Sequence, residues 1–183
     1  MSERIPLLVL GLGNVLLEDD GVGGAAVSLL RERFDAPRGA QVFDGGTLGL
    51  SLLPYLDMAD AVILVDAVRA DGAPGSLVRL DGDEVARAVA TRLSPHQVGV
   101  ADLLDGARWL ERYPSRVVLL GLVPFSMHLA VGLSPQVHAS LPALVDRIVQ
   151  EAAALGFVFE ARGADEPPDR DGHLDVARLA GMR

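Results

Sequence analysis

The chain has 183 residues, half of them hydrophobic, and carries a formal net charge of −9 without a single lysine or cysteine. Its length suits one α/β domain. The missing cysteines exclude disulfides, thiolate metal sites and a cysteine nucleophile, and the charge disfavours a nucleic-acid partner, which needs clustered Lys and Arg. No apolar run approaches the roughly 18 residues of a membrane span, and no signal-peptide pattern opens the chain, so we expect a cytoplasmic protein that does not enter a membrane.

The first half of the chain alternates short apolar strands with helical patterns. Residues 5–10 form a continuous apolar run ended by glycine, which is typical of a strand buried on both faces of a sheet. From residue 22, apolar side chains recur at helical spacing until Pro37 prevents further helix. Next come a predicted strand at residues 41–44, a short helix at residues 50–57 and the clearest buried strand, residues 61–65.

The second half predicts a mixed sheet and a tail. The link of residues 68–75 is too short for a crossover helix, so the strand predicted at residues 76–80 cannot lie parallel and adjacent to the one before it. The other predicted elements are helices at residues 83–90 and 100–113, a strand at 116–122 and a helix at 135–155. Residues 1–160 therefore form one predicted α/β domain, and the polar, proline-rich residues 161–183 a predicted mobile C-terminal tail.

A glycine-rich loop at residues 11–23 joins the first strand to the first helix. Gly11 and Gly13 permit a sharp turn, and Asp19 and Asp20 stand beside the helix start, where carboxylates commonly cap free backbone N–H groups. A purely structural capping role is therefore one interpretation. A dinucleotide-binding loop is disfavoured, because Leu16 occupies the place of the third glycine.

Two further polar residues occupy positions typical of functional groups. Asp66 ends the buried strand at residues 61–65, where open α/β sheets gather functional side chains. His96 follows Ser94 and Pro95 in a capping-box pattern, and an imidazole in the first turn of a helix has a lowered pKa, which keeps it available as a ligand or base. A histidine with no chemical role at a helix end remains the alternative.

Asp20, Asp66 and His96 should converge at one rim of the sheet, since each follows a strand or opens a helix. Two carboxylates and an imidazole suit nickel or zinc and leave coordination positions open. Because rim residues make few packing contacts, replacing any of the three should cost little stability while abolishing activity.

Six segments resemble the endopeptidases that mature the large subunit of nickel–iron hydrogenases. They occur in the family's order and at its spacing, over roughly residues 5–156, at residues 11–23, 44–49, 64–67, 73–76, 94–97 and 132–134. The resemblance implies a three-layer sandwich of the phosphorylase/hydrolase-like kind: a mixed, mostly parallel five-stranded twisted sheet with helices on both faces.

The resemblance also implies a function. It predicts an endopeptidase that removes the C-terminal extension of the hydrogenase large-subunit precursor after nickel insertion. The family's three metal-contacting positions fall on Asp20, Asp66 and His96, and the enzyme brings no cofactor of its own, because nickel is supplied by the substrate. Its partner would be the nickel-loaded precursor.

Recognition of that precursor is assigned by the resemblance to the segment Asp44, Gly45, Gly46 and Thr47. The chain departs from some relatives at Phe125, where they carry an acidic residue, and partner choice is expected to differ accordingly.

Two alternatives come from other classes. Peptidyl-tRNA hydrolases share a Gly-x-Gly-Asn start, but they need a basic surface for tRNA, which this chain lacks. A non-catalytic assembly factor that binds the precursor without cutting it is the second alternative, and the presence of Asp20, Asp66 and His96 argues against it.

Overall fold

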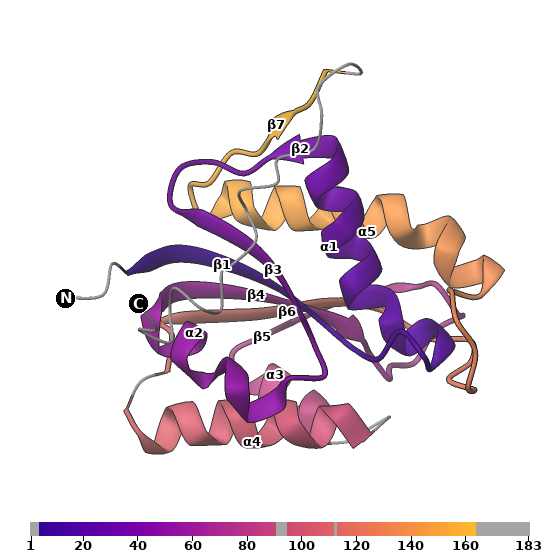
Figure 1. The fold of residues 1–183 in the computed structure, drawn as a ribbon, viewed down its shortest axis with the longest axis horizontal. Coiled ribbons are helices and arrows are strands. Elements are labelled where there is room, and N and C mark those ends of the chain that lie inside the picture. The colour runs from indigo at the N-terminus through magenta and orange to yellow at the C-terminus, as the bar shows by residue number, and fades with distance from the viewer. Residues whose placement is uncertain (1–3, 91–94, 112, 164–183) are drawn as a thin grey trace, which may run out of the picture.

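A five-stranded sheet with strand order β3-β1-β4-β6-β5 forms the middle layer of the computed structural model, which describes residues 4–90, 95–111 and 113–163 (Figure 1). Four strands run parallel, and β5 pairs antiparallel with β6 at one edge. Buried apolar runs make up the two central strands, β1 and β4, because both of their faces are covered. The strands are β1 (Ile5–Leu12), β3 (Ala40–Gly46), β4 (Ala59–Ala67), β5 (Leu77–Asp81) and β6 (Arg116–Leu122).

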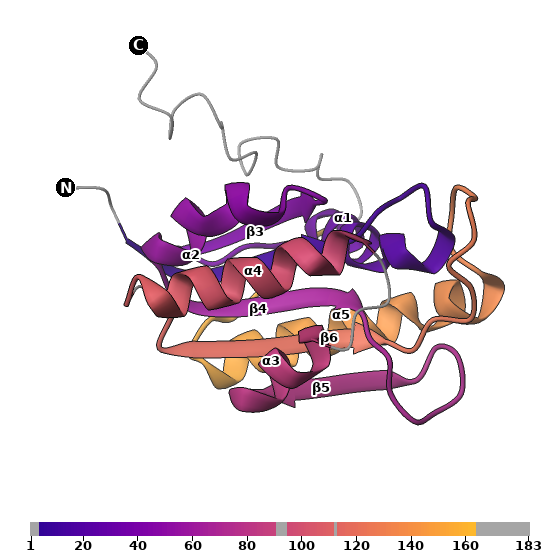
Figure 2. The same ribbon diagram turned by 90° about the horizontal axis from the view of Figure 1, so that it is seen from below.

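Helices cover both faces of this sheet. One face is covered by α1 (Val22–Arg33) and α5 (Pro135–Ala154), and the other by α2 (Leu53–Met58), α3 (Asp83–Ala90) and α4 (Pro95–Trp109) (Figures 1 and 2). The short helices η1 (Glu18–Gly21) and η2 (Gly49–Leu52) precede α1 and α2. The predicted three-layer sandwich with a mixed, mostly parallel sheet is confirmed.

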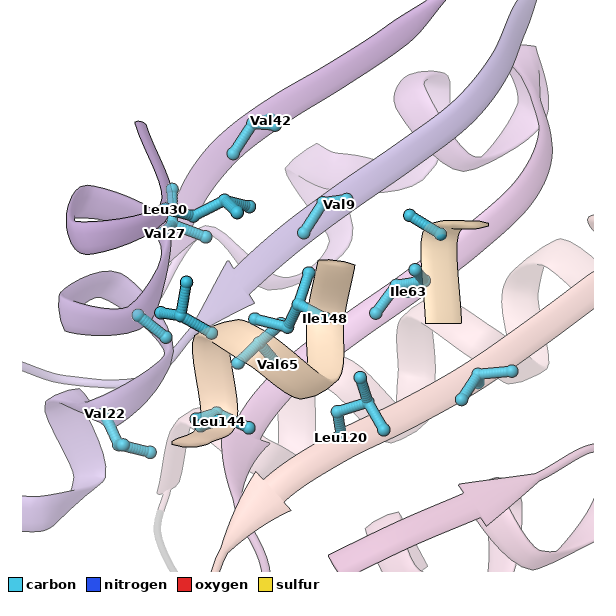
Figure 3. Close-up of a cluster of buried hydrophobic side chains, with 14 of the residues drawn as sticks. Val9, Val22, Val27, Leu30, Val42, Ile63, Val65, Leu120, Leu144 and Ile148 are labelled. Carbon is cyan, nitrogen blue, oxygen red and sulfur yellow. The ribbon is translucent and has the colours of Figure 1, made fainter. Parts of the chain in front are cut away.

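Apolar side chains of α1 and α5 pack on the same face of the sheet and form one hydrophobic core with the strands. In Figure 3, Val27 and Leu30 of α1 and Leu144 and Ile148 of α5 meet alternate residues of the strands, such as Val9. Each of these five side chains is at most 1% exposed. Burying a side chain of this size stabilises the fold by about 1.5–3 kcal/mol, so the shared apolar layer holds both helices on the sheet.

A pair of short strands outside the main sheet differs from the sequence-based prediction. A two-residue strand β2 (Phe34–Asp35) pairs with β7 (Glu160–Ala161), which spans the predicted boundary between the domain (residues 1–160) and the tail (residues 161–183). Arg162 continues this contact, since its backbone N–H donates to Arg33 O at 2.8 Å and its side chain to Asp35. The ordered domain therefore extends past residue 160, and residues 164–183, on which the tail prediction falls, lie outside the described residues.

The last helix begins and ends at specific residues. Ser134 caps α5 by accepting the Val137 N–H, and Gly156 follows the helix with φ of +92°, the backbone conformation that glycine adopts most easily.

In the described part of the chain, no helix combines the length and hydrophobicity that crossing a membrane requires.

An ion-pair network joins α5 to β5, the strand at one edge of the sheet. Arg79 of β5 donates from Nε and Nη2 to the two carboxylate oxygens of Glu151, both at 2.8 Å, and Arg147 donates to Glu151 at 3.0 Å. The hydrogen bonds from Arg79 lower the pKa of Glu151 below its ordinary value of 4.5, against the opposing effect of burial. Bidentate pairing with a buried carboxylate makes this contact stronger than an ordinary surface ion pair.

We predict that Glu151→Gln lowers the free energy of unfolding at pH 7 by about 1–3 kcal/mol, since it removes the charged partner that accepts hydrogen bonds from both Arg79 and Arg147. The ionised form of Glu151 is favoured in the folded state, so its contribution is complete above pH 4.5 and disappears as the pH falls through the lowered folded-state pKa. Urea unfolding of both proteins between pH 3 and pH 7 measures this difference. Asp146→Asn, at an exposed position of the same helix, is the control and should change little; an equal loss at pH 3 and pH 7 would contradict the prediction.

Candidate functional site

The loop between β1 and α1 is packed so closely that it requires glycine. A Cβ at Gly13, which has φ of +126°, would overlap the backbone of Asp20. A Cβ at Gly23 would lie 2.2 Å from both Leu12 O and Val65 O. The first turn of α1 therefore touches the carboxyl ends of β1 and β4 directly, and this contact places Glu18–Gly21 against β4.

Asp20 lies inside this packed loop. Its side chain is 0% exposed, and Oδ2 accepts the backbone N–H of Asn14 at 3.0 Å. The capping interpretation is wrong for α1, because Gly21 is the N-cap and no side chain accepts a hydrogen bond there. The Asp20 carboxylate instead closes its own loop, and the segment that carries it packs on β4.

Asp66 occupies the carboxyl end of β4, as the sequence predicts. Its Oδ1 accepts the backbone N–H of Ala67 at 2.7 Å, and the residue is 4% exposed. Since η1 packs on β4, the fold brings the segments of Asp20 and Asp66 to the same end of the sheet, where the parallel strands finish. Both carboxylates are buried, so the expectation of loosely packed rim residues is wrong for this pair.

His96 is the second residue of α4, but its side chain lies outside the described part of the structure. The carboxyl end of α4 precedes the start of β6, and a 15-residue helix is about 22 Å long. The first turn of α4 therefore points toward the opposite edge of the sheet, where the parallel strands end (Figure 2). Among the side chains that are described, no group of three or more His, Asp or Glu could hold a metal ion.

The segment Asp44 to Thr47 forms a turn beside the glycine loop. Asp44 Oδ1 accepts the Gly46 N–H at 3.0 Å, and Gly46 O accepts the Gly13 N–H at 3.1 Å. The Asp44 carboxylate lies against Gly24, where an added Cβ would be 3.1 Å from Oδ2. This carboxylate therefore faces the positive end of α1. Gly45 is buried, whereas Asp44 and Thr47 are exposed to an incoming partner.

Asp19 has a role that the sequence did not indicate. Its carboxylate is 0% exposed and accepts hydrogen bonds from the backbone N–H groups of Phe125, Ser126 and Ser134, and from the Ser134 hydroxyl, at 2.7–3.0 Å. These donors lie more than 100 positions away in the loop between β6 and α5. Asp19 thus joins that loop to the one that carries Asp20.

Comparison with known proteins identifies the family of this chain. The family model described as hydrogenase maturation protease matches residues 25–151. The hydrogenase 2 maturation protease of Escherichia coli (strain K12) is 35% identical over 144 residues, which cover 78% of this chain and 88% of that protein. The chain belongs to the hydrogenase maturation protease family.

Solved structures agree with this assignment. The hydrogenase maturating endopeptidase HybD from E. coli superposes with a TM-score of 0.81 at 34% identity, covering 86% of this chain and 98% of that one. The hydrogenase maturation protease HybD from Thermococcus kodakarensis gives a TM-score of 0.65 at 28% identity, covering 80% and 99%.

Membership of the hydrogenase maturation proteases confirms the predicted enzyme class, a peptidase. It favours this assignment over the peptidyl-tRNA hydrolase and over the non-catalytic assembly factor. Buried acids in hydrolytic enzymes commonly bind a metal ion or act as acid or base, and both Asp20 and Asp66 are buried.

We predict that Gly23→Ala lowers the free energy of unfolding by about 3 kcal/mol or more, because its Cβ would meet backbone oxygens of β1 and β4 that cannot move aside. Thermal unfolding measures the loss. Gly106→Ala is the matched control: the position is within α4, and a Cβ there meets only Leu50 Cδ2 at 3.9 Å. This control should be neutral or stabilising by up to about 1 kcal/mol, and equal effects of the two substitutions would refute the packing argument.

Proposed function

We propose that this protease removes the C-terminal extension of the nickel–iron hydrogenase large-subunit precursor in the cytoplasm after nickel insertion, with the substrate's nickel as part of the recognition site. The observation that carries the proposal is the pair of buried carboxylates, Asp20 and Asp66, on packed segments at one sheet edge. The membership of the hydrogenase maturation proteases supplies the substrate class.

Nickel held by the precursor's cysteines would be bound by Asp20, Asp66 and His96. The chain has no cysteine of its own, so its side chains offer only harder oxygen and nitrogen donors. Such a mixed set suits a borderline divalent ion. As part of the substrate, the nickel would act as a Lewis acid, either on the scissile carbonyl or on the attacking water, while an aspartate takes up the proton.

Burial of the two carboxylates adds a requirement to this mechanism. Asp20 is 0% and Asp66 4% exposed, so the nickel can reach them only after the atoms that cover them have moved. Part of the free energy of precursor binding would be used for this displacement, which would couple cleavage to correct docking. A precursor without nickel gains no coordination bonds in return.

The segment Asp44 to Thr47 is proposed to contact the metal-loaded part of the precursor. Its position beside the glycine loop supports this role, since Gly46 O and the Gly13 N–H join the two segments. Thr47 is exposed there and makes no described side-chain contact that would have to break.

The first test compares two forms of the precursor. The protease should shorten a nickel-loaded precursor and leave a nickel-free one intact, because coordination by Asp20, Asp66 and His96 needs the ion. Mass spectrometry of the incubated precursors measures the product. Cleavage of both forms at the same rate would rule out nickel recognition while leaving the protease assignment standing.

The second test addresses the carboxylates. Asp66→Asn keeps an oxygen that can accept the Ala67 N–H but loses the charge, so processing should slow by about 100-fold or more. Asp60→Asn on the same strand is the control: Asp60 pairs with Arg4 at the exposed opposite end of β4, where ion pairs contribute little. The rate at which each variant processes the precursor measures the effect of the lost charge. An active Asp66→Asn enzyme would exclude Asp66 from the site.

A further inference from the structure

Five large apolar side chains are exposed on two loops at the carboxyl edge of the sheet. They are Val15, Leu16, Phe125, Leu129 and Val131, exposed by 57%, 53%, 59%, 83% and 82% respectively. We call this set the apolar rim. Its residues come from the loop between β1 and η1 and the loop between β6 and α5, which lie side by side in both ribbon views (Figures 1 and 2).

The apolar rim is unusual for a solvent-exposed loop pair in this chain. Residues 117–145 contain no Asp, Glu, Lys or Arg, although 22% of the whole chain is charged. Exposed apolar side chains that occur singly need no explanation, whereas a group of them without intervening charge marks a surface that is covered by a partner.

Hydrogen bonds hold the two loops of the apolar rim in one conformation. Ala130 N donates to Leu16 O at 3.0 Å, and Glu18 N donates to Ala130 O at 2.9 Å. The buried carboxylate of Asp19 accepts from backbone groups near both ends of the second loop, at Phe125, Ser126 and Ser134. A surface ordered in advance loses little conformational entropy on binding, so the rim has the rigidity expected of a recognition surface.

We infer that the apolar rim binds an uncharged, apolar surface on the folded body of the large-subunit precursor, an inference that rests on the proposed function. The rim adjoins the site, because Asp19, which holds its loops together, is the direct neighbour of Asp20. A partner on the rim therefore lies beside the carboxylates. A second copy of this chain seated there would obstruct that approach, which makes the precursor the better occupant.

The test uses the full-length protease and the nickel-loaded precursor. The triple variant Phe125→Ser, Leu129→Ser, Val131→Ser should raise KM at least about tenfold, because it removes three large apolar side chains whose burial against the precursor would stabilise the complex, and leave kcat within about twofold. All three side chains are exposed, so the variant should fold normally. A double variant, Trp109→Ser with Val158→Ser, is the matched control: these residues are 89% and 64% exposed, Trp109 is the last residue of α4 and Val158 follows the end of α5, and they should change neither constant.

Two outcomes would overturn the inference. One is an unchanged KM in the triple variant while the wild-type enzyme processes the precursor normally. The other is a wild-type protein that sediments as a dimer and a triple variant that sediments as a monomer with the same KM for the precursor. That result would assign the apolar rim to a second copy of this chain. Failure of the wild-type protease to cleave the nickel-loaded precursor would instead refute the proposed function.

Discussion

Direct contact between the first turn of α1 and the ends of β1 and β4 is the constraint on which the site depends. The contact exists because Gly23 and Gly13 have no side chains to separate helix from strand. It sets where η1 lies and therefore brings the Asp20 segment against the strand that ends in Asp66. The glycines of the loop thus act in packing, although the same residues resemble a ligand-binding turn in the sequence.

Neighbouring aspartates in that loop serve different purposes because their surroundings differ. Asp19 is surrounded by hydrogen-bond donors from the loop between β6 and α5, and these donors satisfy both oxygens of its buried carboxylate. Its role is to hold two loops together. Asp20 accepts the Asn14 N–H of its own loop, on a segment that packs on β4, and we propose that a substrate-borne cation meets it there together with Asp66.

Much of the fold could be predicted from the sequence, because uninterrupted apolar runs such as residues 61–65 have one stable location, between two helical layers. The antiparallel edge strand followed from a link too short for a crossover helix. The pairing of β2 with β7 could not be predicted, because two-residue strands have no periodicity to recognise. Asp20 could be named from its position at the start of a helix and Asp66 from its position at the end of a strand, whereas the partners of Asp19 depend on tertiary contacts across more than 100 residues. The convergence of His96 on the two carboxylates stays a prediction.

If Asp20, Asp66 and His96 together bind one divalent ion, diffraction from crystals soaked in nickel or zinc will reveal it. We expect one anomalous peak with carboxylate oxygens of Asp20 and Asp66 and an imidazole nitrogen of His96 each about 2.0–2.2 Å away. An ion bound elsewhere at full occupancy, or a His96 ring turned away from both carboxylates, would contradict it.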